Sequence, residues 1–101
     1  THVTNILHRP PLPQLGPLTS ASIGVAERFH EVTGAPITVC TSVMGTGPSV
    51  RLIVGWESLA DWAAETARGM TDSDFQEQLS IAAAIPGVTL MADSNVMRRL
   101  V

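Results

Sequence analysis

The chain has 101 residues, of which 45% are hydrophobic and 15% are charged, and its formal net charge at pH 7 is −3. This length predicts one domain over residues 1–101 and excludes a second one. Globular proteins average about 25% charged residues. A monomer with so few charges would leave much apolar surface in water, and we therefore predict a homo-oligomer.

The residue types that the chain lacks exclude several functions. All six cationic residues are Arg, and only Arg98 and Arg99 are adjacent, so the sequence has no basic stripe for nucleic acid or an anionic membrane. The absence of Lys excludes Schiff-base chemistry. The single cysteine, Cys40, cannot form an intramolecular disulfide, and no segment approaches about 18 consecutive apolar residues. We expect a cytoplasmic protein with no nucleic-acid or membrane partner.

The first third of the chain predicts a strand and a helix. Residues 3–8 are β-capable, and the four prolines between residues 10 and 17 forbid regular structure after them. The side chains at 19–22 include helix N-cap types, and they precede an apolar helical stripe that runs to Val32. Gly34 and Pro36 are expected to end this helix.

A β-hairpin is predicted next. The runs 37–44 and 50–56 are rich in β-branched residues, and a Gly/Pro cluster at 45–48 separates them. Ser58 and Asp61 then have the spacing of a capping box, in which the acid reaches back to a free backbone amide. We therefore predict that a second helix begins at Ser58.

The second helix carries an apolar stripe, and a shorter helix and a strand follow it. The stripe predicts a helix that packs one face on a sheet, and its members are Leu59, Trp62, Ala63, Thr66, Ala67 and Met70. Gly69 is expected to stop this helix. Residues 71–74 repeat the capping pattern and start a helix that runs to Pro86, and 88–97 predicts the last strand.

The predicted order is β, α, β, β, α, a short extra α, and β. This is the ferredoxin-like βαββαβ arrangement of the α+β class, with an antiparallel sheet and helices on one face. No segment is left for a second fold unit or a long linker.

Alternation along the strands divides the sheet into two faces. The face that we place under the helices comprises Val3, Asn5, Leu7, Ile37, Val39, Thr41, Val43, Val50, Leu52, Val54 and Trp56. The opposite, mixed face comprises His2, Thr4, Ile6, His8, Thr38, Cys40, Ser42, Arg51, Ile53, Thr89, Met91, Asp93, Asn95 and Met97. We expect a homodimer to cover this mixed face. A register error of one residue would exchange the faces, especially in the first and last strands.

Two segments resemble a known superfamily. Residues 54–62, V-G-W-E-S-L-A-D-W, resemble the dimeric α/β-barrel superfamily, and within it the antibiotic-biosynthesis monooxygenase-like branch. Residues 70–76, M-T-D-S-D-F-Q, are similar to the acidic-aromatic segment that follows the second helix in such domains. The resemblance covers residues 3–97 and implies a ferredoxin-like subunit that dimerises through its sheet.

The resemblance also implies pocket residues. Its oxygenase and haem-degrading members line a pocket with a strand-one Asn and a Trp near the second helix, which here are Asn5, Trp56 and Trp62. Haem-degrading members also use a His on or after the second helix, whereas this chain has no His after His30. We therefore predict no haem and no other cofactor.

Each candidate site residue also has a structural interpretation. Asn5 could hold a substrate oxygen, although a strand Asn more often bonds backbone groups. Trp56, Trp62 and Phe29 could line a pocket for a flat ligand or anchor the core. Cys40 would act only as a thiolate beside a base, whereas a free Cys is commonly buried and inert.

Bases and metal ligands are few. His8 and His30 are the side chains able to serve as neutral-pH bases. Glu27 and His30 have the Glu-x-x-His spacing of di-iron bundles, but such a site needs a second copy of the motif. The sequence contains no HExxH or CxxC motif, and we predict no metal site. The candidate catalytic residues are His8 and Asn5, and the candidate substrate-binding residues are Trp56, Trp62, Phe29 and Cys40.

Two functional interpretations remain open. The first is a cofactor-independent oxygenase, cyclase or isomerase that acts on an aromatic or polyketide-like substrate in a cavity between sheet and helices. In such a site the protein supplies orientation, a dry cavity and a hydrogen bond to a developing oxyanion. The second is a non-catalytic dimeric module that binds a small ligand or a protein partner. The shortage of bases slightly favours the second.

Overall fold

A computed structural model describes residues 2–45, 47–98 and 100 of the chain. Among residues named above, Thr46 of the predicted turn and Arg99 lie outside the described residues. The elements, in chain order, are β1 (His2–Arg9), a short 3-10 turn η1 (Leu12–Gln14), α1 (Leu15–Thr33), β2 (Ile37–Ser42), β3 (Ser49–Trp56), α2 (Leu59–Met70), α3 (Ser73–Ala83) and β4 (Thr89–Arg98). The predicted order of strands and helices, including the extra helix before the last strand, is confirmed.

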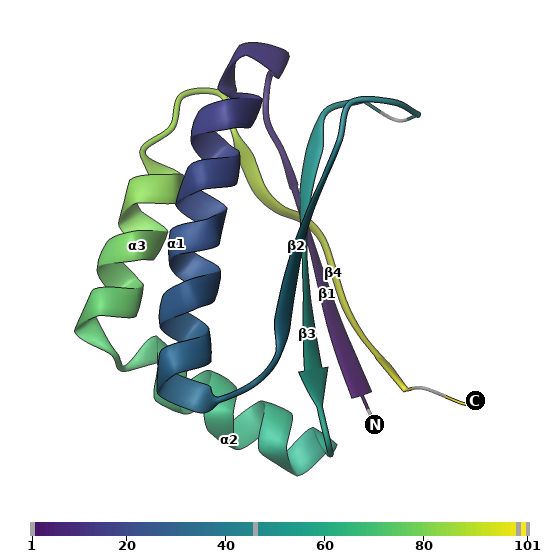
Figure 1. Ribbon diagram of the computed structural model, residues 1–101, viewed down its shortest axis with the longest axis vertical. Helices are drawn as coiled ribbons and strands as arrows, with labels where there is room; N and C mark the ends of the chain where they lie inside the picture. Colours follow the sequence, from purple (N-terminus) through teal and green to yellow (C-terminus); the bar gives the residue numbers. More distant parts are fainter. Residues whose placement is uncertain (1, 46, 99, 101) are drawn as a thin grey trace.

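The four strands form one antiparallel sheet in the order β2-β3-β1-β4. Figure 1 shows α1 and α3 side by side over one face of this sheet, with α2 crossing near one end of them. The same view shows the other face without a covering helix from the described chain. This is the ferredoxin-like α+β architecture that the sequence predicts. None of the helices in the described residues is long and apolar enough to cross a membrane.

Side-chain caps fix where α2 and α3 begin. Ser58 Oγ accepts a hydrogen bond from the backbone N of Asp61 at 3.0 Å, and an Asp72 carboxylate oxygen accepts one from the backbone N of Phe75 at 2.9 Å. Each bond satisfies a donor that has no partner within the helix. Both predicted caps are confirmed.

Asp72 also joins α3 to α1. Arg28 on α1 donates two hydrogen bonds to the Asp72 carboxylate, from Nε at 2.8 Å and from a terminal nitrogen at 2.9 Å. The Arg28 hydrogen bond, and secondly the Phe75 amide, lower the pKa of Asp72 from 3.8 to about 2. The stability that this depressed pKa contributes is present above pH 3.8 and is lost as the pH falls towards 2.

Three predicted boundaries are wrong. The first helix begins at Leu15 and not within 19–22, because Pro17 lies in its first turn, where backbone N–H groups have no helical partner to lose. The strand β2 ends at Ser42, two residues before its predicted end. Gly69 does not stop α2, which continues through Met70.

Gly69 is instead a point of close approach between α2 and α1. A Cβ atom built at Gly69 would lie 2.6 Å from Cε1 of Phe29. Side-chain carbons do not approach so closely, so only glycine lets the Phe29 ring pack there.

The register of β1 corrects one predicted face. Thr4 pairs with Val54 and Ile6 with Leu52, so the even-numbered residues of β1 lie on the helix side together with these β3 residues. The set Val3, Asn5 and Leu7, predicted to lie under the helices, is therefore on the other face. Both alternate sets of this strand contain apolar residues, and only pairing with β3 distinguishes them.

The remaining strands mostly follow the prediction. Residues of β2 and β3 pair so that the predicted helix-side residues of the two strands share one face, apart from Val43, which lies beyond the end of β2. In β4, Asp93, Asn95 and Met97 pair with Leu7, Asn5 and Val3 on the side away from the helices. We call this side the open face, and it comprises Val3, Asn5, Leu7, Thr38, Cys40, Ser42, Arg51, Ile53, Asp93, Asn95 and Met97. Met91, predicted for this face, lines the cavity described below because the β1–β4 register shifts beside it.

Candidate functional site

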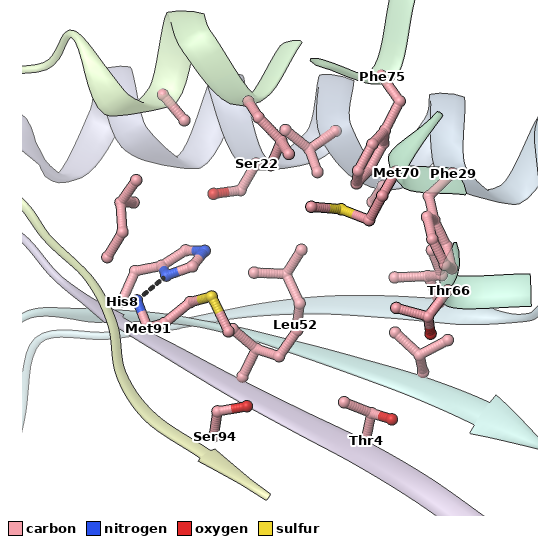
Figure 2. Close-up of a pocket in the computed structure, with 18 of the residues that line it drawn as sticks. Thr4, His8, Ser22, Phe29, Leu52, Thr66, Met70, Phe75, Met91 and Ser94 are labelled. Atoms are coloured by element: carbon pink, nitrogen blue, oxygen red, sulfur yellow. Dashed lines mark hydrogen bonds between the residues drawn. The ribbon is translucent and has the colours of Figure 1, made fainter. Parts of the chain in front are cut away.

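A cavity of about 730 Å³ lies between the helix side of the sheet and the helices. Its walls come from all four strands on the sheet side and from all three α-helices on the other side, and Figure 2 draws 18 of the lining residues. Nearly all of the lining is aliphatic or aromatic, and among the described residues no Asp, Glu, Lys or Arg contributes to it. An arrangement of this kind accommodates an apolar, uncharged molecule.

The helix α2 borders the cavity and does not pack flat on the sheet. Of its residues only Gly69 is buried, whereas Leu59 and Met70 are about half exposed. Trp62, Thr66 and Met70 line the cavity. Trp62 also packs against the core cluster that contains Val54 and Trp56 of β3. The predicted stripe therefore packs on the sheet in part, at Trp62, while Thr66 and Met70 border the cavity.

Aromatic side chains form one end of the cavity. The Trp56 ring, buried from solvent, donates a hydrogen bond from Nε1 to Thr4 Oγ1 at 2.8 Å. Phe29 meets Trp56 edge to face, with ring centroids 5.9 Å apart and an interplanar angle of 87°. Trp62 lines the cavity as well. The structure thus brings together three of the four predicted substrate-binding residues, Trp56, Trp62 and Phe29.

Polar groups lie at another part of the wall. His8 lines the cavity, and its Nδ1 accepts a hydrogen bond from the backbone N of Met91 at 2.9 Å. The Ser22 side chain on α1 is 2% exposed, and its Oγ has no hydrogen-bond partner among the described residues. Figure 2 shows the Ser22 hydroxyl and the His8 ring pointing into the same part of the cavity.

The bond from Met91 determines which nitrogen of His8 carries the proton. A backbone N–H donates to a lone pair, so Nδ1 is unprotonated and the neutral ring carries its proton on Nε2. Burial lowers the pKa of His8 from its ordinary value of 6.5 and keeps the ring neutral. The ring therefore presents a donor N–H at Nε2, and its one basic lone pair is occupied by Met91. The sequence predicts that His8 acts as a base, whereas this ring offers the cavity a hydrogen-bond donor.

Asn5 and Cys40 do not take part in the cavity. Both lie on the open face by register, opposite Ile53 and Arg51 respectively, and neither is among the lining residues. The structure therefore does not bring Asn5 and Cys40 together with the other candidate residues at this cavity. The Cys40 side chain is exposed. Asn5 Oδ1 is buried without a hydrogen-bond partner among the described residues.

His30 is engaged elsewhere. Its Nδ1 lies 2.8 Å from the carbonyl oxygen of Ala35, to which it donates. Within residues 2–45, 47–98 and 100, no group of three His, Cys, Asp or Glu side chains lies where it could hold a metal ion.

Sequence reasoning missed Ser22, Thr4 and Met91. Ser22 carried a usable signal, because it lies three residues before Val25 and seven before Phe29, a polar member of an apolar helical stripe. The hydrogen bond between Thr4 and Trp56 depends on the β1 face, which the sequence does not determine. The contact between Met91 and His8 depends on a register shift that has no residue signature.

As a sequence, the chain matches no family model and no curated protein. Its structure is similar to several solved ones. A NIPSNAP domain protein from Burkholderia xenovorans is 14% identical with a TM-score of 0.80, over 99% of this chain and 95% of that one. A protein from Nitrosomonas europaea, provisionally assigned as an antibiotic biosynthesis monooxygenase, is 14% identical with a TM-score of 0.69 over the whole of both chains.

SnoaB, a cofactor-independent oxygenase from Streptomyces nogalater, is 13% identical with a TM-score of 0.65, over 98% of this chain and 93% of that one. Identities this low establish a shared fold and nothing about chemistry. The resemblance that residues 54–62 and 70–76 suggest is confirmed at this level: the chain has the ferredoxin-like fold of the NIPSNAP and antibiotic biosynthesis monooxygenase-like proteins.

Proposed function

We propose that this protein binds one small, uncharged, largely apolar molecule in the cavity between its sheet and helices. The observation that carries this proposal is the 730 Å³ cavity with its nearly continuous apolar lining. The volume falls within the roughly 300–1,000 Å³ of small-molecule sites. A charged ligand would lose its hydration there without gaining a side chain of opposite charge from the lining residues.

The position of α2 supports the proposal. Its apolar residues Trp62 and Met70 border the cavity, and the exposed fraction of Met70 is 49%. Met70 therefore lies between solvent and the cavity, where a ligand could enter. Burial of such side chains against a ligand is favourable at about 25 cal/mol per Å² of apolar area.

Titration with N-phenyl-1-naphthylamine, a neutral probe that fluoresces in apolar surroundings, tests the proposal. We expect saturable binding of one probe per chain. Thr66→Phe should block it, because Thr66 lines the cavity. Ala67→Phe is the matched control: Ala67 is exposed on the same helix and is not among the lining residues, so binding should persist. Equal binding by both variants, or none by the unmodified protein, would contradict the proposal.

A second candidate is a cofactor-independent oxygenase that acts on an aromatic or polyketide-like substrate. It is favoured by the fold shared with SnoaB and by the Nε2–H donor of His8 in an apolar cavity, which is suited to an oxyanion. Against it, no carboxylate or free basic nitrogen among the described residues lines the cavity. Oxygen uptake with an anthrone as probe substrate distinguishes the two: an oxygenase consumes oxygen faster than buffer, whereas a binding module does not.

A further inference from the structure

The apolar cavity contains a polar corner formed by His8 on β1 and Ser22 on α1. These residues are far apart in sequence and come from opposite walls, and both side chains point into the same space (Figure 2). Ser22 Oγ is buried and unpartnered among the described residues. Leaving a buried hydroxyl unsatisfied is unfavourable, so a ligand that completes its hydrogen bonding gains affinity.

The backbone around His8 fixes the ring as a hydrogen-bond donor. Between the pairs Leu7↔Asp93 and Arg9↔Thr89, the strand β1 has one residue where β4 has three. Met91 lies in this irregularity with φ of 52°, the only non-glycine residue with positive φ in the described chain. Such a conformation is unfavourable for a residue with a Cβ atom. In this conformation the Met91 amide N–H donates to His8 Nδ1. The donor of the ring within the cavity is therefore Nε2–H.

We propose that this corner binds the carbonyl oxygen of a neutral aromatic ketone, with His8 Nε2–H and the Ser22 hydroxyl as the two donors. A carbonyl oxygen has two lone pairs and can accept from both. A carboxylate could also accept two bonds, but none of the described lining residues is a cation that would offset its desolvation. The inference rests on the proposed binding function and specifies the chemical class and orientation of its ligand.

Two probes that differ only at the carbonyl test this inference. The first is 6-propionyl-2-(dimethylamino)naphthalene, a neutral ketone whose emission shifts to the red when its carbonyl accepts hydrogen bonds. The second is 6-propyl-2-(dimethylamino)naphthalene, in which a CH2 group replaces the carbonyl while the ring, the amine and the side-chain length stay the same. Fluorescence titration gives the dissociation constant of each, and the emission maximum reports the carbonyl bond.

The variants separate ligand recognition from structural support. In His8→Asn the amide oxygen can still accept from the Met91 N–H, and the amide NH2 ends closer to the backbone than Nε2 does, so it falls short of the ligand carbonyl. Ser22→Ala removes only the hydroxyl. Each should weaken ketone binding roughly 2–10-fold, the loss of one net hydrogen bond, shift its emission to the blue, and leave the amine probe unchanged. Ser20→Ala, which removes an exposed hydroxyl of α1 outside the cavity lining, should change neither probe.

The possible outcomes separate the two proposals. If both probes bind and the variants affect them equally, or not at all, the carbonyl corner is refuted while the cavity remains a binding site. If neither probe binds the unmodified protein, the proposed binding function fails, and the inference with it. If Ser20→Ala weakens binding of the ketone as much as Ser22→Ala does, the effect is not specific to this corner, and the inference is refuted.

Discussion

At the residue scale, the aromatic wall of the cavity depends on the hydrogen bond from Trp56 Nε1 to Thr4 Oγ1. Thr4→Val keeps the shape of the side chain and leaves the buried indole N–H without an acceptor. A buried donor without a partner costs about 1–3 kcal/mol. We therefore expect the free energy of unfolding, measured by denaturant titration, to fall by that amount.

The control for this variant is Thr66→Val, which removes a half-buried hydroxyl from the same cavity. It should change the free energy of unfolding by no more than about 0.5 kcal/mol. Equal losses of unfolding free energy in the two variants would show that the hydrogen bond from Trp56 to Thr4 contributes no more to stability than the Thr66 hydroxyl does.

At the element scale, α2 is held against α1 by the contact between Gly69 and the Phe29 ring. An added Cβ at position 69 would lie 2.6 Å from a ring carbon, so Gly69→Ala must displace Phe29. Overpacking of this kind costs about 1–3 kcal/mol, against a gain of up to about 1 kcal/mol in helix propensity. We expect a net loss of up to about 2 kcal/mol in the free energy of unfolding.

Gly24→Ala in α1 is the matched control, because a Cβ built at Gly24 meets only the end of the flexible Gln78 side chain, which can move aside. Relief of unfolded-chain entropy should stabilise this variant by about 0.4–1 kcal/mol. Thermal and denaturant unfolding of both variants give the comparison. Stabilisation by Gly69→Ala would contradict the close approach.

The elements themselves were largely predictable, because their signals are local. The starts of α2 and α3 follow from the cap positions of Ser58 and Asp72, and Gly34 ends α1 with φ of 74°. The face of β1 was not predictable, since Val3 and Leu7 on one side are as apolar as Ile6 on the other. Pairing with β3 decides it, and that pairing is a non-local fact.

The candidate site was predictable only in part, for the same reason. Trp56 and Phe29 are large aromatic residues at core periods, and both reach the cavity wall. A helical stripe looks the same whether it packs on a sheet or borders a cavity, so the sequence does not indicate that part of the α2 stripe lines a cavity. The roles of His8 and Ser22 require two walls to meet in space, which no spacing in the sequence encodes.

At the scale of the whole molecule, the open face remains uncovered by any helix of the described chain (Figure 1). Leu7 pairs with Arg51 on one side and with Asp93 on the other, so a cation and an anion flank an apolar residue on this face. Asn5 Oδ1 lies on it buried and without a described partner. We propose that a second copy of the chain covers the open face.

A two-fold axis makes such an interface complementary to itself, because it can set the cation of each copy against the anion of the other. The protein should then sediment as a dimer at micromolar concentration. Arg51→Glu places like charges together, which costs several kcal/mol, and should weaken the dimer at least about 10-fold. Adding Asp93→Arg to that variant should restore it, whereas Arg68→Glu on the exposed side of α2 should have no effect. A monomer in the unmodified protein would refute the interface, and failure of the charge exchange to restore the dimer would show that Arg51 and Asp93 do not meet across it.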